Sequence, residues 1–361
     1  MNDNISQLLE TIKGFTESRG FVTKQSIGLL DPRFGYPFSP SATHHIIDDI
    51  VCKNPLPQPV MKFSVIPDRS LRMYDIDKIG ISNRHLSFFE TIAFGYVGNS
   101  QQLPKEQACI EVFDLMLHLG IKPENLLVTC LKDVKAEGTE IDNKEDEIFF
   151  KTWSKLLGKE RVKLTSGRRN LFYSRVIGNP GGTGCEIYHR IGDSYVEIGS
   201  QVNYKFKFTG GLERTSNAAV PEGFGLERLL MPLEGVKKVS DVSTVLPLKK
   251  CVRDYLRAKG EDDLTIDLYD ESLTKIADSI RAISFIIMDT NGNIDSLTSS
   301  QSKLLRDFRK TLCSEKSEIN YLGIYDSSIY RTLVDTSLAT YNSRYPDMIN
   351  HRQAVLDFIT P

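Results

Sequence analysis

The chain has 361 residues, of which 40% are hydrophobic, and its formal net charge at pH 7 is −2. This length suits two domains, or one large domain with an appendage, and the apolar content excludes a disordered chain. The near-neutral charge gives no electrostatic indication of nucleic acid, although it does not exclude a local basic face.

The sequence has no pattern typical of a membrane protein. The longest apolar runs, such as 283–288, are too short to span a bilayer, and the polar N-terminus MNDNISQLLE is unlike a signal peptide. Six cysteines and six histidines are scattered without a CxxC or HxxxH pair, and the adjacent His44 and His45 have no cysteine partner. This spacing is typical of reduced, mostly buried thiols rather than of disulfides or a zinc site. We therefore expect a cytoplasmic protein with no zinc and no membrane partner.

The first two thirds of the chain mix helical and strand patterns. Apolar residues at helical spacing predict helices at 5–19, 106–119 and 148–157. Alternation and short apolar runs predict strands at 61–66, 86–91, 125–131, 185–188 and 194–208. The proline-rich segment 31–41 is predicted to be a loop before a short helix from about residue 42, and the charged segment 132–146 an exposed loop. Trp153 is expected in the core.

From about residue 246 only helical patterns remain. Helices are predicted at 248–259, 272–288, 304–312, 328–341 and 352–358, with a polar loop at 289–302. Within the second helix, Ile276, Ile280, Ile283 and Ile287 form one apolar stripe. We therefore predict an α+β domain over residues 1–245 and an all-α domain over residues 246–361.

The stretch PEGFGLERLL, residues 221–230, is the clearest candidate for a binding site. Gly223 and Gly225 permit close approach of the backbone, and Arg228 lies in the first turn of a predicted helix. Helix N-termini favour anions, and a planar guanidinium there can stack on a nucleobase or fork onto phosphate oxygens. The alternative is a glycine turn that enters a helix with a solvent-facing arginine.

Three further features suggest ligand binding without specifying it. Arg69, Arg72 and Arg84 surround one predicted hairpin, which suits either a polyanion clamp or a solvated loop. The glycine-rich segment 178–184 is neither a Walker motif nor a dinucleotide fingerprint, and it either brings amides close to a ligand or only turns. Glu197 lies in an otherwise apolar strand, where a carboxylate is either paired with a basic residue or holds a cation.

Taken in order, these motifs resemble a known family. Arg72, RHLSFFE at 84–90, GNPGGTGCEI at 178–187, VEIGSQV at 196–202 and GFGLERL at 223–229 follow the order of motifs in class II aminoacyl-tRNA synthetases, specifically alanyl-tRNA synthetase. The segment KIADSIRAISFIIMD at 275–289 resembles the helix after that family's catalytic core. The resemblance covers roughly residues 5–360 and does not extend to the family's editing and C-terminal domains.

The resemblance implies a fold and a reaction. It implies an α+β fold with an antiparallel sheet flanked by helices, followed by a helical domain similar to the family's tRNA-acceptor-binding region. The reaction would be that of a ligase that forms an aminoacyl-adenylate from ATP and an amino acid with Mg²⁺, which requires positioning and positive charge.

By the resemblance, six residues would bind ATP. Arg72 would hold the α-phosphate, and Phe89 and Arg228 would enclose the adenine. Arg84 would contact the outer phosphates, and Glu197 would bind Mg²⁺. The implied ATP-binding set is Arg72, Arg84, Phe89, Glu197, Gly225 and Arg228, with Arg72 and Arg228 as the catalytic residues.

The sequence departs from the family where the amino acid would bind. Tyr173 replaces a tryptophan of the pocket, and Ser200 replaces an asparagine. Pro221 stands where the family has the aspartate that pairs with the substrate ammonium group, and losing that partner leaves a buried charge poorly paired. Either the substrate is not alanine, or the contact runs through Glu222 or Glu186. The side chain of Glu222 is expected to point elsewhere on its strand.

The segments that would handle tRNA are altered as well. The loop between Arg72 and Asp75 is short, and LTSSQS at 297–302 stands where the family reads the acceptor stem. The segment 304–312 offers three basic residues, which suit either phosphate contacts or a solvated face: Arg306, Arg309 and Lys310.

Three functions remain open from the sequence. The first is an amino acid-activating ligase that transfers to an acceptor other than standard tRNA-Ala: a carrier protein, a small amine or an unusual tRNA. The second is a minimal alanyl-tRNA synthetase without editing, and the third is a non-catalytic, ATP- or amino acid-binding regulatory paralogue. The sequence names neither the amino acid nor the oligomeric state.

Overall fold

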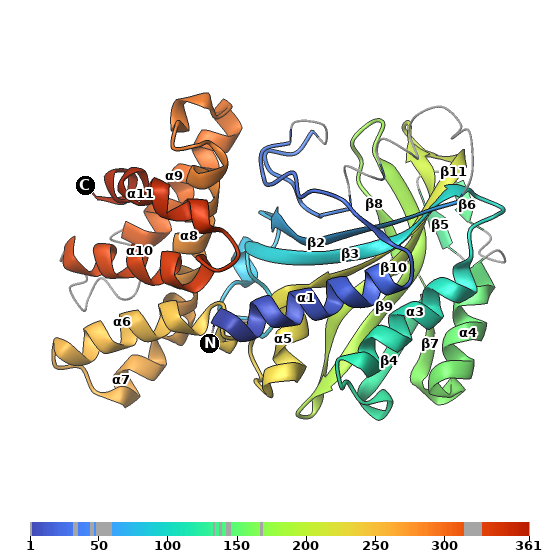
Figure 1. Cartoon of the computed structure of the whole chain (residues 1–361), viewed down its shortest axis with the longest axis horizontal. Helices are drawn as coiled ribbons and strands as arrows, with labels where there is room; N and C mark the ends of the chain where they lie inside the picture. Colours follow the sequence, from blue (N-terminus) through green and yellow to red (C-terminus); the bar gives the residue numbers. More distant parts are fainter. Residues whose placement is uncertain are drawn as a thin grey trace.

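A nine-stranded sheet forms the centre of the N-terminal part (Figure 1). The computed structural model describes residues 2–31, 35–43, 47, 60–132, 134–136, 139–141, 146–166, 169–313 and 327–360. The strand order is β1 (Val22–Thr23), β2 (Met61–Leu71), β3 (Phe88–Asn99), β11 (Leu212–Gly225), β10 (Ser194–Phe208), β9 (Pro180–Ile191), β4 (Leu126–Leu131) and β7 (Val162–Thr165), with β8 (Leu171–Tyr173) beside β9. Among the described strands, only β1–β2 and β4–β7 pair in parallel. The predicted antiparallel sheet flanked by helices is confirmed.

Side-chain alternation gives the sheet two different faces. On β3, Phe88, Ile92 and Phe94 belong to the main hydrophobic core. Phe89 and Thr91, which point the other way, line a cavity. The core face is covered by α1 (Asn2–Ser18), α3 (Lys105–His118) and α4 (Glu147–Leu157), which lie side by side along the sheet (Figure 1). The opposite face is therefore available to build a site.

The C-terminal part contains helices and connecting turns, with no strand among its described residues. Its helices are α6 (Leu246–Ala258), α7 (Asp263–Leu268), α8 (Asp270–Asp289), η7 (Ile294–Ser296), α9 (Ser299–Cys313), α10 (Ser327–Tyr341), η9 (Pro346–His351) and α11 (Arg352–Ile359). Helix α8 is the central one, and its predicted isoleucine stripe is buried. This region packs against one end of the sheet (Figure 1), and one continuous hydrophobic core runs through both parts.

Several local predictions differ from the structure. Within the segment 132–146, expected to be a loop, β5 (Val134–Ala136) and β6 (Thr139–Ile141) form an antiparallel hairpin. Most of β11 was not predicted, because only the residues around Glu222 were expected to form a strand. LTSSQS at 297–302, part of a segment predicted to be a loop, contains the first residues of α9. The short helix expected from about residue 42, and His44 and His45, lie largely or wholly outside the described residues.

The glycine-rich segment 178–184 is mostly strand rather than loop. Gly181, Gly182 and Gly184 are part of β9, and only Gly178 has a positive φ, of 90°. A Cβ on Gly184 would lie 2.1 Å from the backbone oxygen of Gln201, and one on Gly182 would lie 2.4 Å from that of Asn203. The glycines are therefore needed for close packing of β9 on β10.

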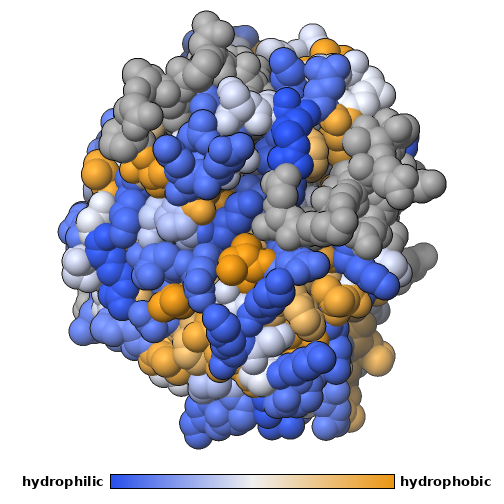
Figure 2. All heavy atoms as spheres, turned by 90° about the vertical axis from the view of Figure 1, so that its right-hand side faces the viewer, coloured by the Kyte–Doolittle hydropathy of each residue, from blue (hydrophilic) through white to orange (hydrophobic). Residues whose placement is uncertain are grey.

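The surface at the end opposite the helical region is mainly hydrophilic. Figure 2 shows small, separate groups of hydrophobic residues on it rather than one continuous patch. Among the described helices, none has the length and apolar character to cross a membrane.

Gly184→Ala should lower the free energy of unfolding by about 1–3 kcal/mol, because the added methyl group overlaps the β10 backbone. Gly14→Ala on α1, where a Cβ meets nothing within 4 Å, should raise it by about 0.5–1 kcal/mol. Urea denaturation of both variants checks this. Equal stability of Gly184→Ala and the wild type would contradict the packing role.

Candidate functional site

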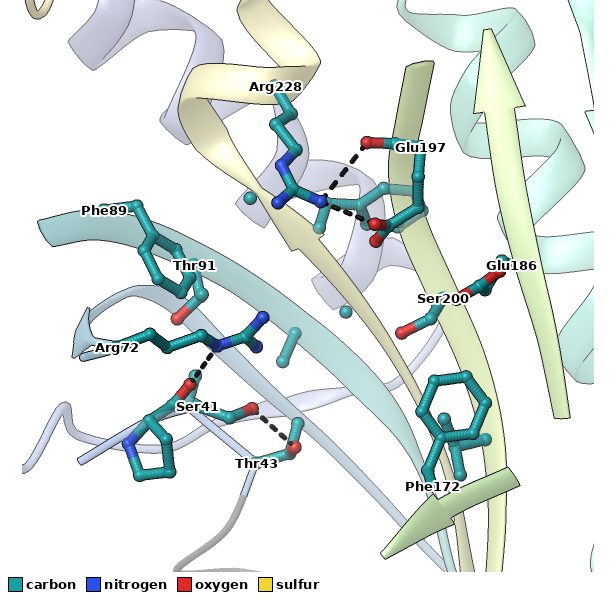
Figure 3. A pocket seen from close by; sticks show the side chains of 18 of the residues that line it. Ser41, Thr43, Arg72, Phe89, Thr91, Phe172, Glu186, Glu197, Ser200 and Arg228 are labelled. Atoms are coloured by element: carbon teal, nitrogen blue, oxygen red, sulfur yellow. Dashed lines mark hydrogen bonds and ion pairs between the residues drawn. The ribbon is translucent and has the colours of Figure 1, made fainter. Parts of the chain in front are cut away.

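A cavity of about 500 Å³ opens on the face of the sheet that α1, α3 and α4 leave uncovered (Figure 3). Its walls come from β3, β8, β9, β10, β11, the start of α5 (Leu226–Glu234) and the segment 36–43. Ten of the predicted site residues line it: Arg72, Arg84, Phe89, Tyr173, Glu186, Glu197, Ser200, Pro221, Gly225 and Arg228. The fold thus brings together residues that are far apart in the sequence.

Arg228 is held at the N-terminal turn of α5 by two neighbours. Its Nε donates to the backbone oxygen of Arg84 at 3.0 Å, and its Nη1 lies 2.6 Å from Oε2 of Glu197 (Figure 3). Of the two readings of Glu197, the structure thus shows pairing with a basic residue. The two side chains keep 19% and 24% of their surfaces exposed, so a ligand can reach them.

Arg72 approaches the cavity from the opposite wall. Its Nε donates to the backbone oxygen of Pro40 at 2.9 Å, and its guanidinium carbon lies 4.9 Å from the ring centroid of Phe89. Figure 3 shows the guanidinium end pointing into the cavity. The Nε anchor fixes the side chain while its terminal nitrogens face a ligand, an arrangement suited to phosphate or carboxylate oxygens.

The histidine beside this group adds no permanent charge. His85 lines the cavity, and its Nδ1 lies 2.5 Å from Oγ of Ser82. Burial, followed by the nearby positive charge of Arg228, lowers the pKa of His85 below its usual value. The imidazole is therefore neutral at pH 7, and the positive charge in this part of the cavity comes from the arginines.

Glu186 is an acid at the other end of the cavity. It pairs across β9–β10 with Ser200, and the hydroxyl of Tyr188 donates to its Oε2 at 2.6 Å. Burial, and then the bond to Glu186, raise the pKa of Tyr188 well above its usual value, so the phenol keeps its proton. Tyr173, also in the cavity wall, stacks on Phe208 with ring centroids 6.2 Å apart.

Glu222 does not reach the cavity, which contradicts its proposed contact with a substrate ammonium group. It lies on the helix-covered face of the sheet, is fully buried, and accepts from Nε2 of Gln201 at 2.8 Å. Burial raises the pKa of Glu222 well above its usual value. The expectation that this side chain points away from its neighbour Pro221 is correct.

Of the carboxylates that line the cavity, Glu197 is the one expected to bind Mg²⁺. Among the described residues, no group of three or more histidine, cysteine, aspartate or glutamate side chains could hold a metal ion. Mg²⁺ usually binds through one or two carboxylates together with substrate phosphates and water. Glu197 therefore fits Mg²⁺ only when a nucleotide supplies further ligands. Its carboxylate would then contact both the metal and Arg228.

Several cavity residues were not predicted. Thr91 and Ala93 follow Phe89 at the strand period of two, so an extended alternation would have identified them. Ser41 and Thr43, whose hydroxyls are 3.2 Å apart, come from a proline-rich segment without a regular pattern. Only tertiary structure brings them to the cavity.

The class of the protein follows from comparison with known families. The family described as tRNA synthetases class II (A) matches residues 48–361, so the chain belongs to this family. This confirms the resemblance seen in the sequence.

Similar proteins are alanine–tRNA ligases. The chain is 26% identical over 310 residues to that of Thermoanaerobacter sp. strain X514, covering 80% of this chain and 32% of the relative. It is 29% identical over 290 residues to that of Legionella pneumophila strain Lens, covering 77% and 31%. The chain thus spans about a third of the length of these relatives.

Solved structures show a more distant similarity. Apo histidyl-tRNA synthetase from S. aureus has a TM-score of 0.42 at 11% identity, covering 72% of this chain and 78% of that one. A structure described as the RNA binding domain of threonyl-tRNA synthetase from Cryptosporidium parvum Iowa II has a TM-score of 0.41 at 12% identity, covering 75% and 79%.

Glu222→Gln should make the protein more stable at neutral pH. Because the folded state raises the pKa of this carboxyl, it keeps a proton that the unfolded chain releases above about pH 4.5. Wild-type stability should therefore fall as the pH rises above about 4.5 toward neutral, by at most about 1.4 kcal/mol per pH unit from this group. The free energy of unfolding of Glu222→Gln should lack this contribution to the pH dependence.

Urea denaturation of both proteins at several pH values measures the difference. Glu147→Gln, an exposed site on α4, is the control and should change stability by less than about 0.5 kcal/mol. Identical pH slopes for Glu222→Gln and the wild type would show that Glu222 is ionised in the fold.

Proposed function

We propose that this protein activates an amino acid with ATP, forming an aminoacyl-adenylate and pyrophosphate. The observation that carries the proposal is the pair of arginines, Arg72 and Arg228, each fixed through Nε to a backbone carbonyl within the same cavity as Phe89. An aromatic face and fixed guanidinium groups match the two parts of a nucleotide, the base and the phosphates.

In this proposal the cavity residues position the reactants. Arg72 holds the α-phosphate while a carboxylate oxygen of the amino acid attacks the α-phosphorus. A new oxygen–phosphorus bond forms, the bond to the bridging oxygen breaks, and pyrophosphate leaves with the electron pair. Phe89 and Arg228 enclose the adenine beside Gly225, and Arg84 contacts the outer phosphates. Mg²⁺ at Glu197 would neutralise phosphate charge.

We further propose that Glu186 pairs with the substrate ammonium group. Pro221 supplies no charge, and Glu222 lies behind the sheet. Glu186 lines the cavity next to Ser200, with Tyr173 in the same wall, and its carboxylate is oriented by the Tyr188 hydroxyl. An uncompensated ammonium in such a site would cost several kcal/mol, so the acid has a clear energetic role.

For the acceptor we propose something other than standard tRNA-Ala: a carrier protein, a small amine or an unusual tRNA. The short turn after Arg72 and the segment 297–302, at the start of α9, support this choice. The second candidate is a minimal alanyl-tRNA synthetase, favoured by the alanine–tRNA ligases among the relatives. Incubation with alanine, ATP and total tRNA separates the two, since alanylation of standard tRNA-Ala at ordinary synthetase rates would refute the first.

Arg228→Ala should reduce amino acid-dependent ATP–pyrophosphate exchange by about 10²–10³-fold, because a fixed positive group at the nucleotide is lost. Arg352→Ala removes an exposed arginine paired with Asp335 on the C-terminal helices and should leave exchange unchanged. The assay is run with a panel of amino acids that includes non-proteinogenic ones. Exchange that persists in Arg228→Ala would contradict the assignment.

Glu186→Gln should raise the KM for the amino acid by about tenfold or more while the KM for ATP changes little, because only the ammonium group loses a charged partner. Tyr188→Phe, which removes only the orienting hydroxyl, should have a smaller effect of the same kind. Steady-state exchange kinetics measure both. A rise confined to the KM for ATP would place Glu186 at the nucleotide instead.

A further inference from the structure

A network of buried polar side chains lies behind the nucleotide end of the cavity. It joins β3 and α5, which carry cavity residues, to α8, α10 and the turn that follows α10. Its members are Glu90, Glu227, Asp278, Arg281, Tyr341, Arg344 and Tyr345. The side chains of Glu90, Glu227, Asp278 and Arg281 are at most 1% exposed. Of the seven residues in the network, Glu227 alone lines the cavity.

Arg281 is the centre of this network. Its Nη1 donates to the backbone oxygen of Phe88 at 3.1 Å, and its Nη2 donates to Glu227. Its Nε donates to the hydroxyl of Tyr341 at 2.6 Å, which in turn donates to the backbone oxygen of Thr244 at 3.2 Å. One guanidinium group thus fixes β3, α5 and α10 relative to one another.

Two of the three elements that Arg281 joins, β3 and α5, also meet directly. The backbone N–H of Glu90 donates to Oε2 of Glu227 at 3.1 Å. On β3, the residue between Phe88 and Glu90 is Phe89, which faces the cavity, and on α5 the residue after Glu227 is Arg228. The distance between Phe89 and Arg228 therefore depends on contacts made by their buried sequence neighbours.

Additional bonds hold the start of β3 from the side of the helical region. Asp278 accepts from the backbone N–H groups of Ser87 and Phe88 at 3.0 and 3.4 Å. Glu90 accepts from Nη2 of Arg344 at 2.9 Å and from the hydroxyl of Tyr345 at 2.9 Å. The residues on both sides of Phe89 are thus tied to the helical region, Phe88 through its backbone and Glu90 through its side chain.

Stability alone does not account for this arrangement. Replacing a buried ion pair with well-packed apolar side chains is often neutral or stabilising, because desolvation offsets the attraction between the charges. An ion pair with several directional bonds does, however, permit only one geometry. The neighbouring ring of Phe88, stacked on Phe285 with centroids 4.2 Å apart, shows that apolar packing is available at the same interface.

We propose that Arg281 is a positioning residue for nucleotide binding: through the Phe88 carbonyl and Glu227 it sets the separation of Phe89 and Arg228. The proposal rests on the nucleotide role of the cavity given above. It also means that the helical region, which would begin at residue 246, supplies part of the geometry of the activation site. In that case residues 1–245 are not a catalytic unit that is independent of the helical region. The boundary at 245/246 marks only a change from α+β to all-α architecture.

The test compares Arg281→Met and Arg281→Lys with Ile283→Ala, a fully buried apolar site on the same helix. Kinetics are measured at a temperature at which circular dichroism shows every variant folded. Arg281→Met should raise the KM for ATP by about tenfold or more and leave the KM for the amino acid within about twofold, because misplacement affects the nucleotide end. Arg281→Lys should also raise the KM for ATP. The donors of an ammonium group all lie on one nitrogen, so they cannot reproduce the three bonds that the planar guanidinium makes through separate nitrogens. Ile283→Ala should lose stability with an unchanged KM for ATP.

A second measurement does not depend on nucleotide binding. Amide hydrogen exchange in the free protein should become faster over residues 84–90 and 226–230 in Arg281→Met, and not in Ile283→Ala. Should Arg281→Met fail to fold, Tyr341→Phe, which removes one of the three bonds, should show the same exchange pattern to a smaller degree.

The outcomes separate the two proposals. A wild-type protein that does not bind ATP would refute the nucleotide role, while the exchange pattern would still decide the positioning role. A wild-type KM for ATP in Arg281→Met, or unchanged exchange in both segments, would overturn the positioning proposal.

Discussion

The alternation of side chains along β3, β10 and β11 is the constraint on which the site depends. Each strand contributes one set of residues to the core beneath α1, α3 and α4 and the other set to the cavity. Ser200 and Gly223 pair on the cavity face, and their neighbours Gln201 and Glu222 pair on the core face. A shift of one residue in the pairing would exchange these sets, so the register fixes both the core and the site.

Electrostatics within the cavity follow from how its charged groups are anchored. Arg72 and Arg228 each have one nitrogen bound to a backbone carbonyl, which limits the conformational entropy lost when a ligand binds. Glu197 partly balances Arg228, and His85 is kept neutral by burial. The end of the cavity that holds Arg72 and Arg228 is therefore positive, while Glu186 gives the other end an acid. This distribution suits a zwitterionic amino acid next to a polyphosphate.

The sequence predicts the parts of this arrangement that depend on local pattern. The isoleucine stripe of α8, the strand 194–208 and the opposite directions of the Pro221 and Glu222 side chains all follow from periods of 3.6 or 2. The ordered motifs also led to the correct family and to residues that share one cavity. The roles of those residues remain predictions.

What the sequence could not show depends on long-range contacts. Glu90 and Arg344 are 254 residues apart, and nothing in either local pattern indicates their bond. The glycines of β9 look like a loop because composition alone does not reveal how closely β10 approaches them. Most of β11 could not be predicted because proline and asparagine give its sequence a low strand propensity. The strand forms because β3 and β10 pair with it on both sides.

A crystal structure with a non-hydrolysable aminoacyl-adenylate analogue, an aminoacyl sulfamoyl adenosine, tests the central claim most directly. We expect adenine between Phe89 and Arg228, the sulfamoyl oxygens within hydrogen-bond distance of Arg72, and the ammonium group at Glu186. An analogue bound outside this cavity, or bound within it with the ammonium group away from Glu186 and the base away from Phe89, would contradict the account.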